Sequence, residues 1–324
     1  MLRLGETYQY QGDVTRWCPS EEGAPSTPIA QGPSYIAVRE LARLLGADAS
    51  VKGAHGDKSG AMSASLDAVR FGHDFAQSDR DFMGGMMGLL AAEIGSMQAQ
   101  RHVDGLSPAA ARAAIRRLET IRSEEITLPR IIRTGQRAWL AHCDDYFTHP
   151  QTIPGQETPA ARLSIRFRRD ALLLRYGKQG LVNRYMAWSD NAIHVASLPY
   201  QKQKTRSYGH VPTDACEQVE PLDLARTAKN VAFVEALEDV LLVRLAIQAY
   251  RGEHAGAAPP SLQELTRGAN PYLHNLPRDP FSPDGQAPLR YNAGRAYSVG
   301  KNGVDEGSTR DDIDQTGIHD PDAR

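Results

Sequence analysis

The stretch DLARTAKNVAFVEALEDVLLVRLAIQAY, residues 223–250, has the residue spacing of one long amphipathic helix. Its apolar residues recur mainly at four-residue intervals, so they gather on one helix face. They are Leu237, Leu241, Leu245 and Ala249, with Phe233, Val234, Val240 and Leu242 widening the stripe. The pattern stops at Arg251-Gly252, where glycine favours a helix end.

Short segments with dense turn signals follow this helix. The segments PLRY (288–291) and RAYSV (295–299) have strand character and flank Asn292-Ala293-Gly294, which is typical of a hairpin turn. The sequence therefore predicts a small α+β domain over 223–324, made of one long helix and a short antiparallel sheet.

The chain before residue 223 has a different composition. Residues 1–34 are rich in Pro, Gly, Ser and Glu and predict an irregular lead-in. Helical spacing then recurs, and Ser107-Pro108 is a typical helix start. The predicted helices are 35–45, 63–76, 82–99, 108–121 and 185–200, with more helix over 128–185 interrupted by turn residues at 148–159. We expect a mainly α protein, with a multi-helix domain over 35–222 followed by the smaller domain.

Bulk composition narrows the possible classes of function. The chain has 324 residues, 41% of them apolar and 23% charged, which is ordinary for a globular protein. A formal net charge of −2 supplies no uniform field for polyanions, so we expect no nucleic-acid partner. Cys18, Cys143 and Cys216 lie far apart with no CxxC pair, which argues against a zinc ribbon.

The sequence contains no membrane-spanning pattern. The segment MLRLGETYQYQGDV lacks the apolar core of a signal peptide, and no later run approaches the roughly 18 apolar residues that a spanning helix needs. The chain as given is thus expected to be soluble. Because Met1 is followed at once by sequence typical of a domain interior, we hypothesise that the native product begins upstream and carries an anchor there.

Four sequence features downstream of residue 257 occur in a recognisable order. They are a small residue and prolines before Ser261-Leu262, Leu-Pro-Arg-Asp-Pro-Phe at 276–281, a strand bearing Tyr291, and Ser-Val-Gly-Lys-Asn-Gly at 298–303. Together they resemble the soluble C-terminal part of the major pseudopilin of type II secretion systems. More than 220 residues precede the equivalent helix here, so we expect that the chain does not assemble as a pilus subunit.

The preceding region also has a resemblance, based on patterning and the order of parts. YIAVRELARLLGADASVKGAHGDKSGAMSASLDAVRFGHDF, residues 35–75, is similar to the helical part of poorly characterised bacterial envelope proteins that carry such a C-terminal module. This resemblance implies a location in the cell envelope, on the periplasmic or extracellular side.

The acidic C-terminus suggests a calcium-type loop. Residues 302–324 include seven acidic residues and only two basic ones. Carboxylates are hard oxygen ligands, so binding a divalent ion would relieve the repulsion among them. The pseudopilin resemblance implies that Asp311 and Asp312 are side-chain ligands and that the carbonyl of Val299 contributes. It also places Asn302 where the family has an aspartate. Asp305 could compensate for the negative charge that is missing at Asn302. The ion would be structural Ca²⁺; an ion-free acidic end is the open alternative.

Potential catalytic residues are densest at His142, Cys143, Asp144, Asp145 and His149. On a helix, His142 and Asp145 share a face and His149 lies one turn further, so a metal or acid–base site of a hydrolase is one alternative. The spacing matches no standard site, and polar residues at a helix end are the favoured interpretation.

Two glycine-containing segments have non-catalytic interpretations. AHGDKSG, residues 54–60, lacks the first glycine and the Gly-Lys-Ser/Thr of a phosphate loop and is expected to join two helices. Met-Gly-Gly-Met-Met-Gly, residues 83–88, predicts a close helix crossing, with a flexible partner groove as the alternative.

The favoured function is that of a non-enzymatic structural or interaction protein of the envelope with an unidentified protein partner. An accessory component of a type II secretion or pilus-like system, and a hydrolase, are the alternatives.

Overall fold

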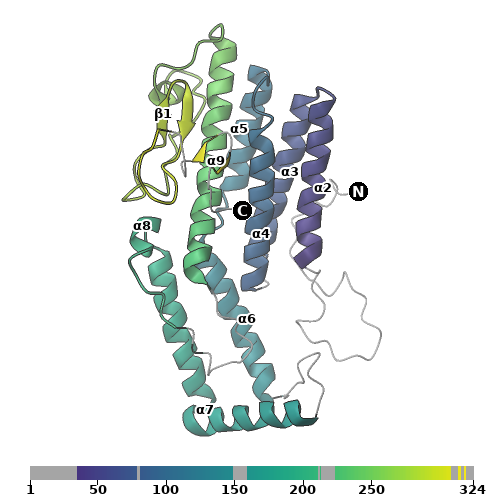
Figure 1. The fold of residues 1–324 in the computed structure, drawn as a ribbon, viewed down its shortest axis with the longest axis vertical. Helices are drawn as coiled ribbons and strands as arrows, with labels where there is room; N and C mark the ends of the chain where they lie inside the picture. The colour runs from purple at the N-terminus through teal and green to yellow at the C-terminus, as the bar shows by residue number, and fades with distance from the viewer. Residues whose placement is uncertain are drawn as a thin grey trace.

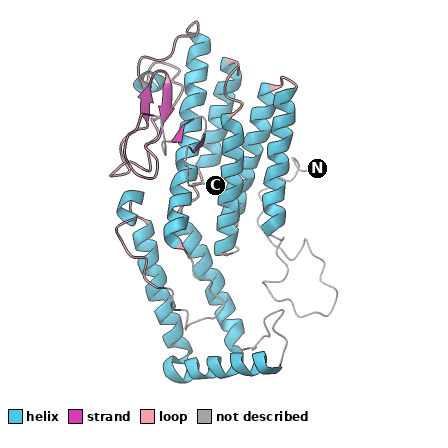
Figure 2. Ribbon diagram, viewed as in Figure 1, coloured by secondary structure: helices cyan, strands magenta, loops and turns pink. Residues whose placement is uncertain are grey.

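The computed structural model describes residues 35–78, 81–148, 159–210, 212, 223–307, 313–314 and 317–318. Within these residues the chain is mainly helical, with two small antiparallel strand pairs near the C-terminal end (Figure 2). The expected mainly α class, with a long helix and a short antiparallel sheet, is confirmed. None of the described helices combines the length and apolarity needed to cross a bilayer.

Four helices of the N-terminal half lie side by side with the long C-terminal helix (Figure 1). They are α2 (Tyr35–Ala54), α3 (Lys58–Gln77), α4 (Phe82–Gln100) and α5 (Pro108–Arg122), and the long helix is α9 (Leu224–Glu253). Helices α2 to α5 each contain one of the segments predicted from helical periodicity, and α9 contains the predicted segment 223–250 apart from Asp223, which caps it. The Ser107 side chain accepts a hydrogen bond from the amide of Ala110 at 3.2 Å, as expected for the start of α5.

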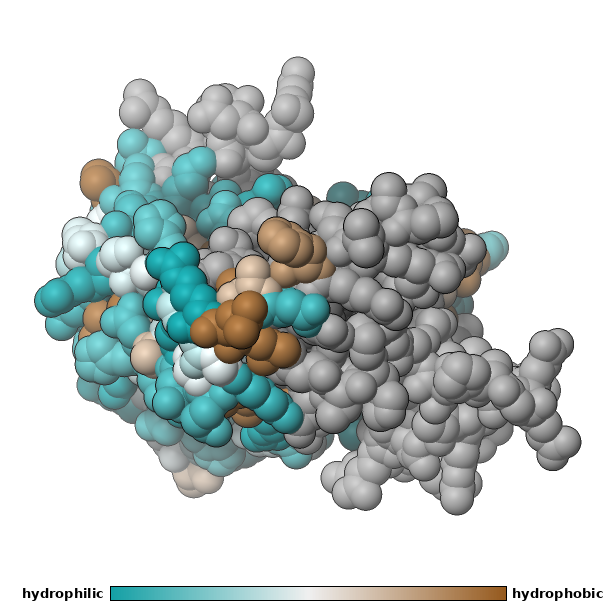
Figure 3. All heavy atoms as spheres, turned by 90° about the horizontal axis from the view of Figure 1, so that it is seen from below, coloured by the Kyte–Doolittle hydropathy of each residue, from teal (hydrophilic) through white to brown (hydrophobic). Residues whose placement is uncertain are grey.

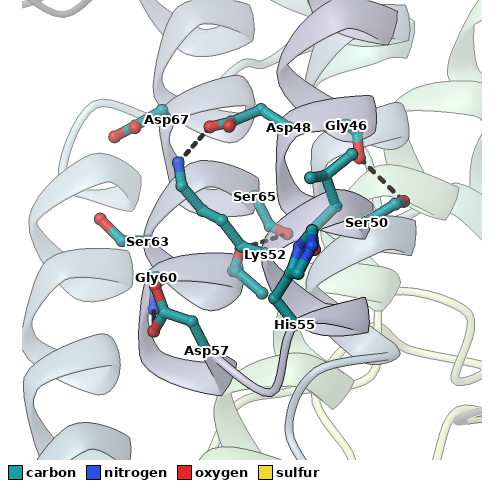
Figure 4. A network of polar contacts seen from close by, with 12 residues as sticks. Gly46, Asp48, Ser50, Lys52, His55, Asp57, Gly60, Ser63, Ser65 and Asp67 are labelled. Carbon is teal, nitrogen blue, oxygen red and sulfur yellow. Dashed lines mark hydrogen bonds and ion pairs between the residues drawn. The ribbon is translucent and has the colours of Figure 1, made fainter.

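The segment 54–60 joins α2 to α3, which confirms its predicted role as a connector. Asp57 caps α3 by accepting a hydrogen bond from the amide of Gly60 at 2.7 Å. Figure 4 shows this junction, where His55 lies beside the end of α2 and its Nδ1 is 2.8 Å from the carbonyl oxygen of Val51. His55 and Asp57 thus contact backbone groups at the two helix ends.

Helices α3 and α4 cross at very short range because glycines occupy the crossing. A Cβ added at Gly88 would lie 2.3 Å from the amide nitrogen of Ala76, and one at Gly72 would lie 2.3 Å from that of Ala92. Both are closer than a van der Waals contact, so only glycine permits this approach. The close crossing predicted for residues 83–88 is confirmed.

Two helices extend below this bundle (Figure 1). They are α6 (Leu128–Thr148) and α7 (Pro159–Ala196), and α7 bends at Gly177, which has a φ of 66°. After the bend α7 returns along α6, where Trp139 stacks on Tyr185 with ring centroids 3.8 Å apart. The short helix α8 (Tyr200–Gln203) follows, so the helix predicted over 185–200 is observed as the end of α7 and the start of α8.

The first half of α7 lies across the lower end of the molecule. Seen from below, hydrophobic and hydrophilic side chains of the described residues lie next to one another on the surface (Figure 3). Phe167 is 76% exposed and Leu174 is 90% exposed. These two side chains therefore lie outside the core, unlike Leu181 beyond the bend, which is fully buried.

Helix α9 is the central element. Every residue from 236 to 247 is buried, so the helix is covered on all sides. One core cluster joins α9 to residues of α3 and α5, such as Leu66 and Leu118, and to Leu273 and Leu289 of the C-terminal segment. The apolar stripe visible in the sequence is thus only part of a fully buried surface.

The C-terminal segment folds against α9. It contains a 3₁₀ turn η2 (Leu262–Thr266) and the strands β1 (Arg290–Asn292), β2 (Arg295–Tyr297), β3 (Ile313–Asp314) and β4 (Gly317–Ile318). β1 pairs with β2 in antiparallel register, Tyr291 opposite Ala296, around the predicted turn. β3 pairs with β4, and an antiparallel bridge joins Ile313 to Ser298.

Candidate functional site: the anchored C-terminal loop

A buried carboxylate anchors the loop that follows β2. Asp279, in the Leu-Pro-Arg-Asp-Pro-Phe turn, is only 1% exposed. Its Oδ1 accepts hydrogen bonds from the Ser298 hydroxyl at 2.7 Å and from the Phe281 amide at 3.0 Å. Its Oδ2 accepts from the Val299 amide at 2.8 Å. Asp279 therefore holds the turn 276–281 against the loop 298–303.

Burial governs the electrostatics of Asp279. Desolvation raises the pKa of this carboxyl, and the hydrogen bonds from Val299, Ser298 and Phe281 lower it, with a net upward shift. All three donors are committed to the carboxylate, so its removal would leave them without an acceptor in the interior. The sequence pattern indicates the motif but does not identify Asp279 as the anchor.

A second hydrogen bond joins the prolines before Ser261-Leu262 to the strand that bears Tyr291. The hydroxyl of Tyr291, on β1, donates to the carbonyl oxygen of Pro259 at 2.6 Å. The prolines that precede Ser261-Leu262 are thereby fixed to the strand that bears Tyr291. Four features that are separate in the sequence thus meet in space as two hydrogen-bonded pairs.

Three of the five predicted calcium ligands lie within the described residues, on one loop. Val299 is 2% exposed, and the Asn302 Oδ1 accepts from the amide of Val304 at 2.6 Å. Asp305 accepts from the Tyr297 hydroxyl at 2.9 Å and lies 3.4 Å from the guanidinium of Arg290. Asp311 and Asp312 lie outside the described residues.

The loop backbone has the expected glycine geometry. Gly300, Gly303 and Gly307 all have positive φ, between 66° and 77°, a region that only glycine enters without strain. Within the described residues no group of three or more His, Cys, Asp or Glu side chains is placed to hold a metal. A calcium site here would therefore need Asp311, Asp312 and backbone carbonyl oxygens to complete it.

The chain returns to the loop immediately after Asp312. The Ser298 amide donates to the Ile313 carbonyl at 3.0 Å, and the Ile313 amide donates to the Ser298 carbonyl at 3.1 Å. The Ile313 side chain is 2% exposed and belongs to a core cluster with Phe281, Val299 and Phe233 of α9. Residues 298 and 313 thus share one packed unit.

The end of the helical region contacts this unit. Gln201 of α8 donates to the carbonyl oxygen of Phe281 at 2.9 Å, and Lys204 donates to that of Lys301 at 3.2 Å. The Tyr200 ring meets Phe281 edge-on, with centroids 5.1 Å apart. The polar sequence after residue 200 indicates only a solvated connection, since nothing in the local pattern identifies the contact partner.

A buried polar cluster lies elsewhere, between α3, α5 and α9. His73 Nε2 is 2.9 Å from Glu238 Oε1, and the Arg122 guanidinium is 3.5 Å from Glu238 and 2.6 Å from Asp239. His73, Glu238 and Asp239 are each no more than 4% exposed. A substrate could not reach these groups without separating the helices, so we assign the cluster to helix packing.

The residues of the hydrolase alternative are not placed by the structure. The backbone of His142–Asp145 belongs to α6, but these side chains, like the whole of His149, lie outside the described residues. The hydrolase alternative stays an untested prediction. Comparison with protein-family models, with curated proteins and with solved structures finds no match for this chain.

Proposed function

We propose that this protein is a non-enzymatic structural or interaction protein of the bacterial cell envelope, on the periplasmic or extracellular side. Its C-terminal part would be a pseudopilin-like module stabilised by Ca²⁺, and its helical part would contact a protein partner. The observation that carries this proposal is the pairing of Asp279 with Ser298 and Val299.

This pairing supports the resemblance because it gives the resembling residues a shared physical role. An aspartate in a proline turn holds the start of the glycine-rich loop, while Tyr291 holds the prolines after α9. The module would then have a structural role, because the buried carboxylate of Asp279 is engaged by hydrogen-bond donors of the module itself.

The calcium assignment rests on the loop geometry. Carbonyl oxygens of a glycine-rich loop and several carboxylates are the hard ligands that Ca²⁺ prefers. The antiparallel bridge between Ser298 and Ile313 brings the residue after Asp312 to the loop that contains Val299 and Asn302. To bind the ion, Asp305 would have to give up its hydrogen bond with Tyr297 and its ion pair with Arg290, so we rank it below the other predicted ligands.

Thermal unfolding of the full chain with Ca²⁺ or with a chelator tests the proposal. An ion that binds only the folded state at one hundred times its dissociation constant adds about 2.7 kcal/mol. We expect a higher melting temperature in Ca²⁺ than in chelator, with a smaller effect of Mg²⁺. The double variant Asp311→Asn/Asp312→Asn should lose the effect.

The matched control is Asp320→Asn/Asp322→Asn, which removes the same charge from the same acidic segment. It should keep the calcium-dependent stabilisation. If Ca²⁺ stabilises neither the native chain nor the control, or stabilises all three proteins equally, the calcium-loop assignment is wrong.

A further inference from the structure

A cavity of about 410 Å³ lies beside α9, away from the loop at 298–303. Its walls come from both parts of the chain. The loop after α4 contributes Val103 and Asp104, α9 contributes one face from Arg244 to Arg251, and the turn between β1 and β2 contributes residues 293–296. A ligand in this cavity would therefore touch the helical region and the C-terminal segment at once.

The charged groups of the cavity are mainly cationic. Arg244, Arg251 and Arg295 line it together with a single carboxylate, Asp104, so its formal charge is +2. The Asp104 carboxylate forms an ion pair with Arg244, Oδ1 to Nη2 at 3.5 Å, and the Asp104 side chain is otherwise 80% exposed. Arg244 and the half-buried Arg251 lie close to low-dielectric walls such as Val103 and Ile247, where their field is screened less than at an open surface, whereas Arg295 is exposed.

Two of the arginines are oriented by hydrogen bonds to carbonyl groups. Arg244 is 9% exposed, and its Nη1 donates to the Gln100 carbonyl at 2.9 Å. Arg251 lies two turns further along the same face of α9, and its Nη2 donates to the Gly294 carbonyl at 3.2 Å. Fixed guanidinium groups lose less side-chain entropy when a ligand binds.

The third arginine is presented by the hairpin turn. Ala293 and Gly294 both have positive φ, 48° and 79°, and they direct the chain into β2 at Arg295. Within the described part of the chain, neither Arg251 nor Arg295 forms an ion pair with a carboxylate. Each guanidinium has five N–H donors in a planar fork that matches two oxygens of a phosphate or carboxylate.

We infer that this cavity binds a small ligand through an oxyanion group, a phosphate or a carboxylate, held by Arg251 and Arg295 with Arg244 beneath them. The inference does not rest on the calcium loop or on the pseudopilin resemblance. Bound across two parts of the chain, the ligand would couple the position of the β1–β2 hairpin to the α4–α5 loop.

Isothermal titration of the full chain with inorganic phosphate and with citrate tests this inference. The titrations are done in chelator, so that calcium plays no part, and at constant ionic strength set with sodium chloride, because screening alone changes anion affinity. We expect saturable binding of at least one anion. Tighter binding of phosphate would assign the site to a phosphorylated ligand, and tighter binding of citrate to a carboxylate ligand.

Variants locate the binding. Arg251→Gln/Arg295→Gln should weaken it at least tenfold, and Asp104→Asn should tighten it because the variant removes the one carboxylate of the cavity. Arg267→Gln is the matched control, since Arg267 is 68% exposed outside the cavity and should leave affinity unchanged. Circular dichroism melts of each variant check that it is folded.

Phenylglyoxal labelling gives a readout on the native chain that needs no substitution. The better-binding anion should protect Arg251 and Arg295 from modification, as measured by peptide mass spectrometry, while Arg267 stays reactive. Binding that is unsaturable at millimolar anion, equal loss of affinity in the Arg267→Gln control, or equal protection of all three arginines would each overturn the inference.

Discussion

Asp279 shows how one side chain can determine the shape of a loop. Its carboxylate is 1% exposed and accepts three hydrogen bonds, two of them from backbone amides. Asp279→Ala would leave these donors unsatisfied in the interior, so we expect a loss of about 3 kcal/mol of unfolding free energy. Urea denaturation of the full chain measures this loss.

The control for this prediction is Asp284→Ala, five residues further along the chain. Asp284 is exposed and accepts one hydrogen bond, from the amide of Gln286 at 2.9 Å, so its removal should cost less than about 1 kcal/mol. Equal losses in the two variants would contradict the anchoring role of Asp279.

Residues whose partners are near in the chain could be predicted from the sequence, and those whose partners are distant could not. Ser107 could be predicted as a helix cap because its partner Ala110 is three positions away. Asp279 binds an amide 20 positions away, and His73 meets Glu238 across 165 positions. Local spacing carries no information about such contacts, and the pseudopilin resemblance indicates a motif without assigning its aspartate a role.

At the scale of elements, the crossing of α3 and α4 depends on glycine. Alanine normally stabilises a helix interior by up to about 1 kcal/mol relative to glycine. At Gly88 the added Cβ would lie 2.3 Å from the backbone of α3, so the helices must separate. We expect Gly88→Ala to destabilise the protein by about 2 kcal/mol despite the helix propensity. Chemical denaturation gives the value.

Gly180→Ala is the matched control within another helix. Its added Cβ would meet only the Cβ of Tyr176, at an ordinary 3.4 Å. The intrinsic preference of alanine should therefore prevail and stabilise the protein by about 0.5–1 kcal/mol. Stabilisation by both substitutions would mean that α3 and α4 are not in close contact.

The buried cluster that joins α3, α5 and α9 predicts a pH dependence. Burial lowers the pKa of His73, but the Glu238 carboxylate and the Glu124 carbonyl raise it more, against Arg122, and the net shift is upward. A raised pKa means that the folded state binds the proton more tightly than the unfolded state, and each tenfold gain in proton affinity stabilises the fold by about 1.4 kcal/mol. This stability is fully present below about pH 6.5, the ordinary pKa of histidine, and is lost as the pH rises through the folded-state pKa.

His73→Gln isolates this contribution. Burial raises the pKa of Asp239 to about 7 and that of Glu235 to about 8, so both titrate within the pH range of the experiment. Both groups and Arg122 are present in the native chain and in the variant, so the difference between the two stabilities removes their own titration and reports on the charge of His73. We expect this difference to shrink as the pH is raised from about 5.5 to about 8.5, a range that spans the ordinary histidine pKa, measured by denaturation at each pH. A difference that is constant or grows with pH would refute the ion pair.

The elements themselves were largely predictable, because amphipathic spacing recurs wherever one helix face is buried. Segments 82–99 and 108–121 match α4 and α5 almost to the residue. Helix α7 was harder, because its apolar residues Phe167 and Leu174 are exposed and because it bends at Gly177. The hairpin was predictable from its Asn-Ala-Gly turn, although the two-residue strands β3 and β4 are too short to produce a pattern.

At the scale of the whole molecule, α9 packs against both the N-terminal helices and the C-terminal segment. Its residues 236–247 are all buried, and its core cluster contains side chains from before residue 122 and after residue 261. Arg112 of α5 reinforces this connection by binding Glu253 at 2.8 Å and the carbonyl of Pro271 at 3.3 Å. The division into domains 35–222 and 223–324 stays a prediction. The packing of α9 against the N-terminal helices argues against independent folding of the second part.

The fragment 223–324 should therefore not fold as an independent unit. Removing the N-terminal helices would take the side chains of α3 and α5 out of the core cluster that contains Val240 and Leu241, leaving an apolar surface that favours aggregation. We expect size-exclusion chromatography to show aggregates, and thermal unfolding followed by circular dichroism to lack a sharp transition, whereas the full chain should unfold cooperatively. A monomeric fragment with a sharp transition would mean that the segment 223–324 folds alone and that α9 packs against the helical bundle only as a docked neighbour.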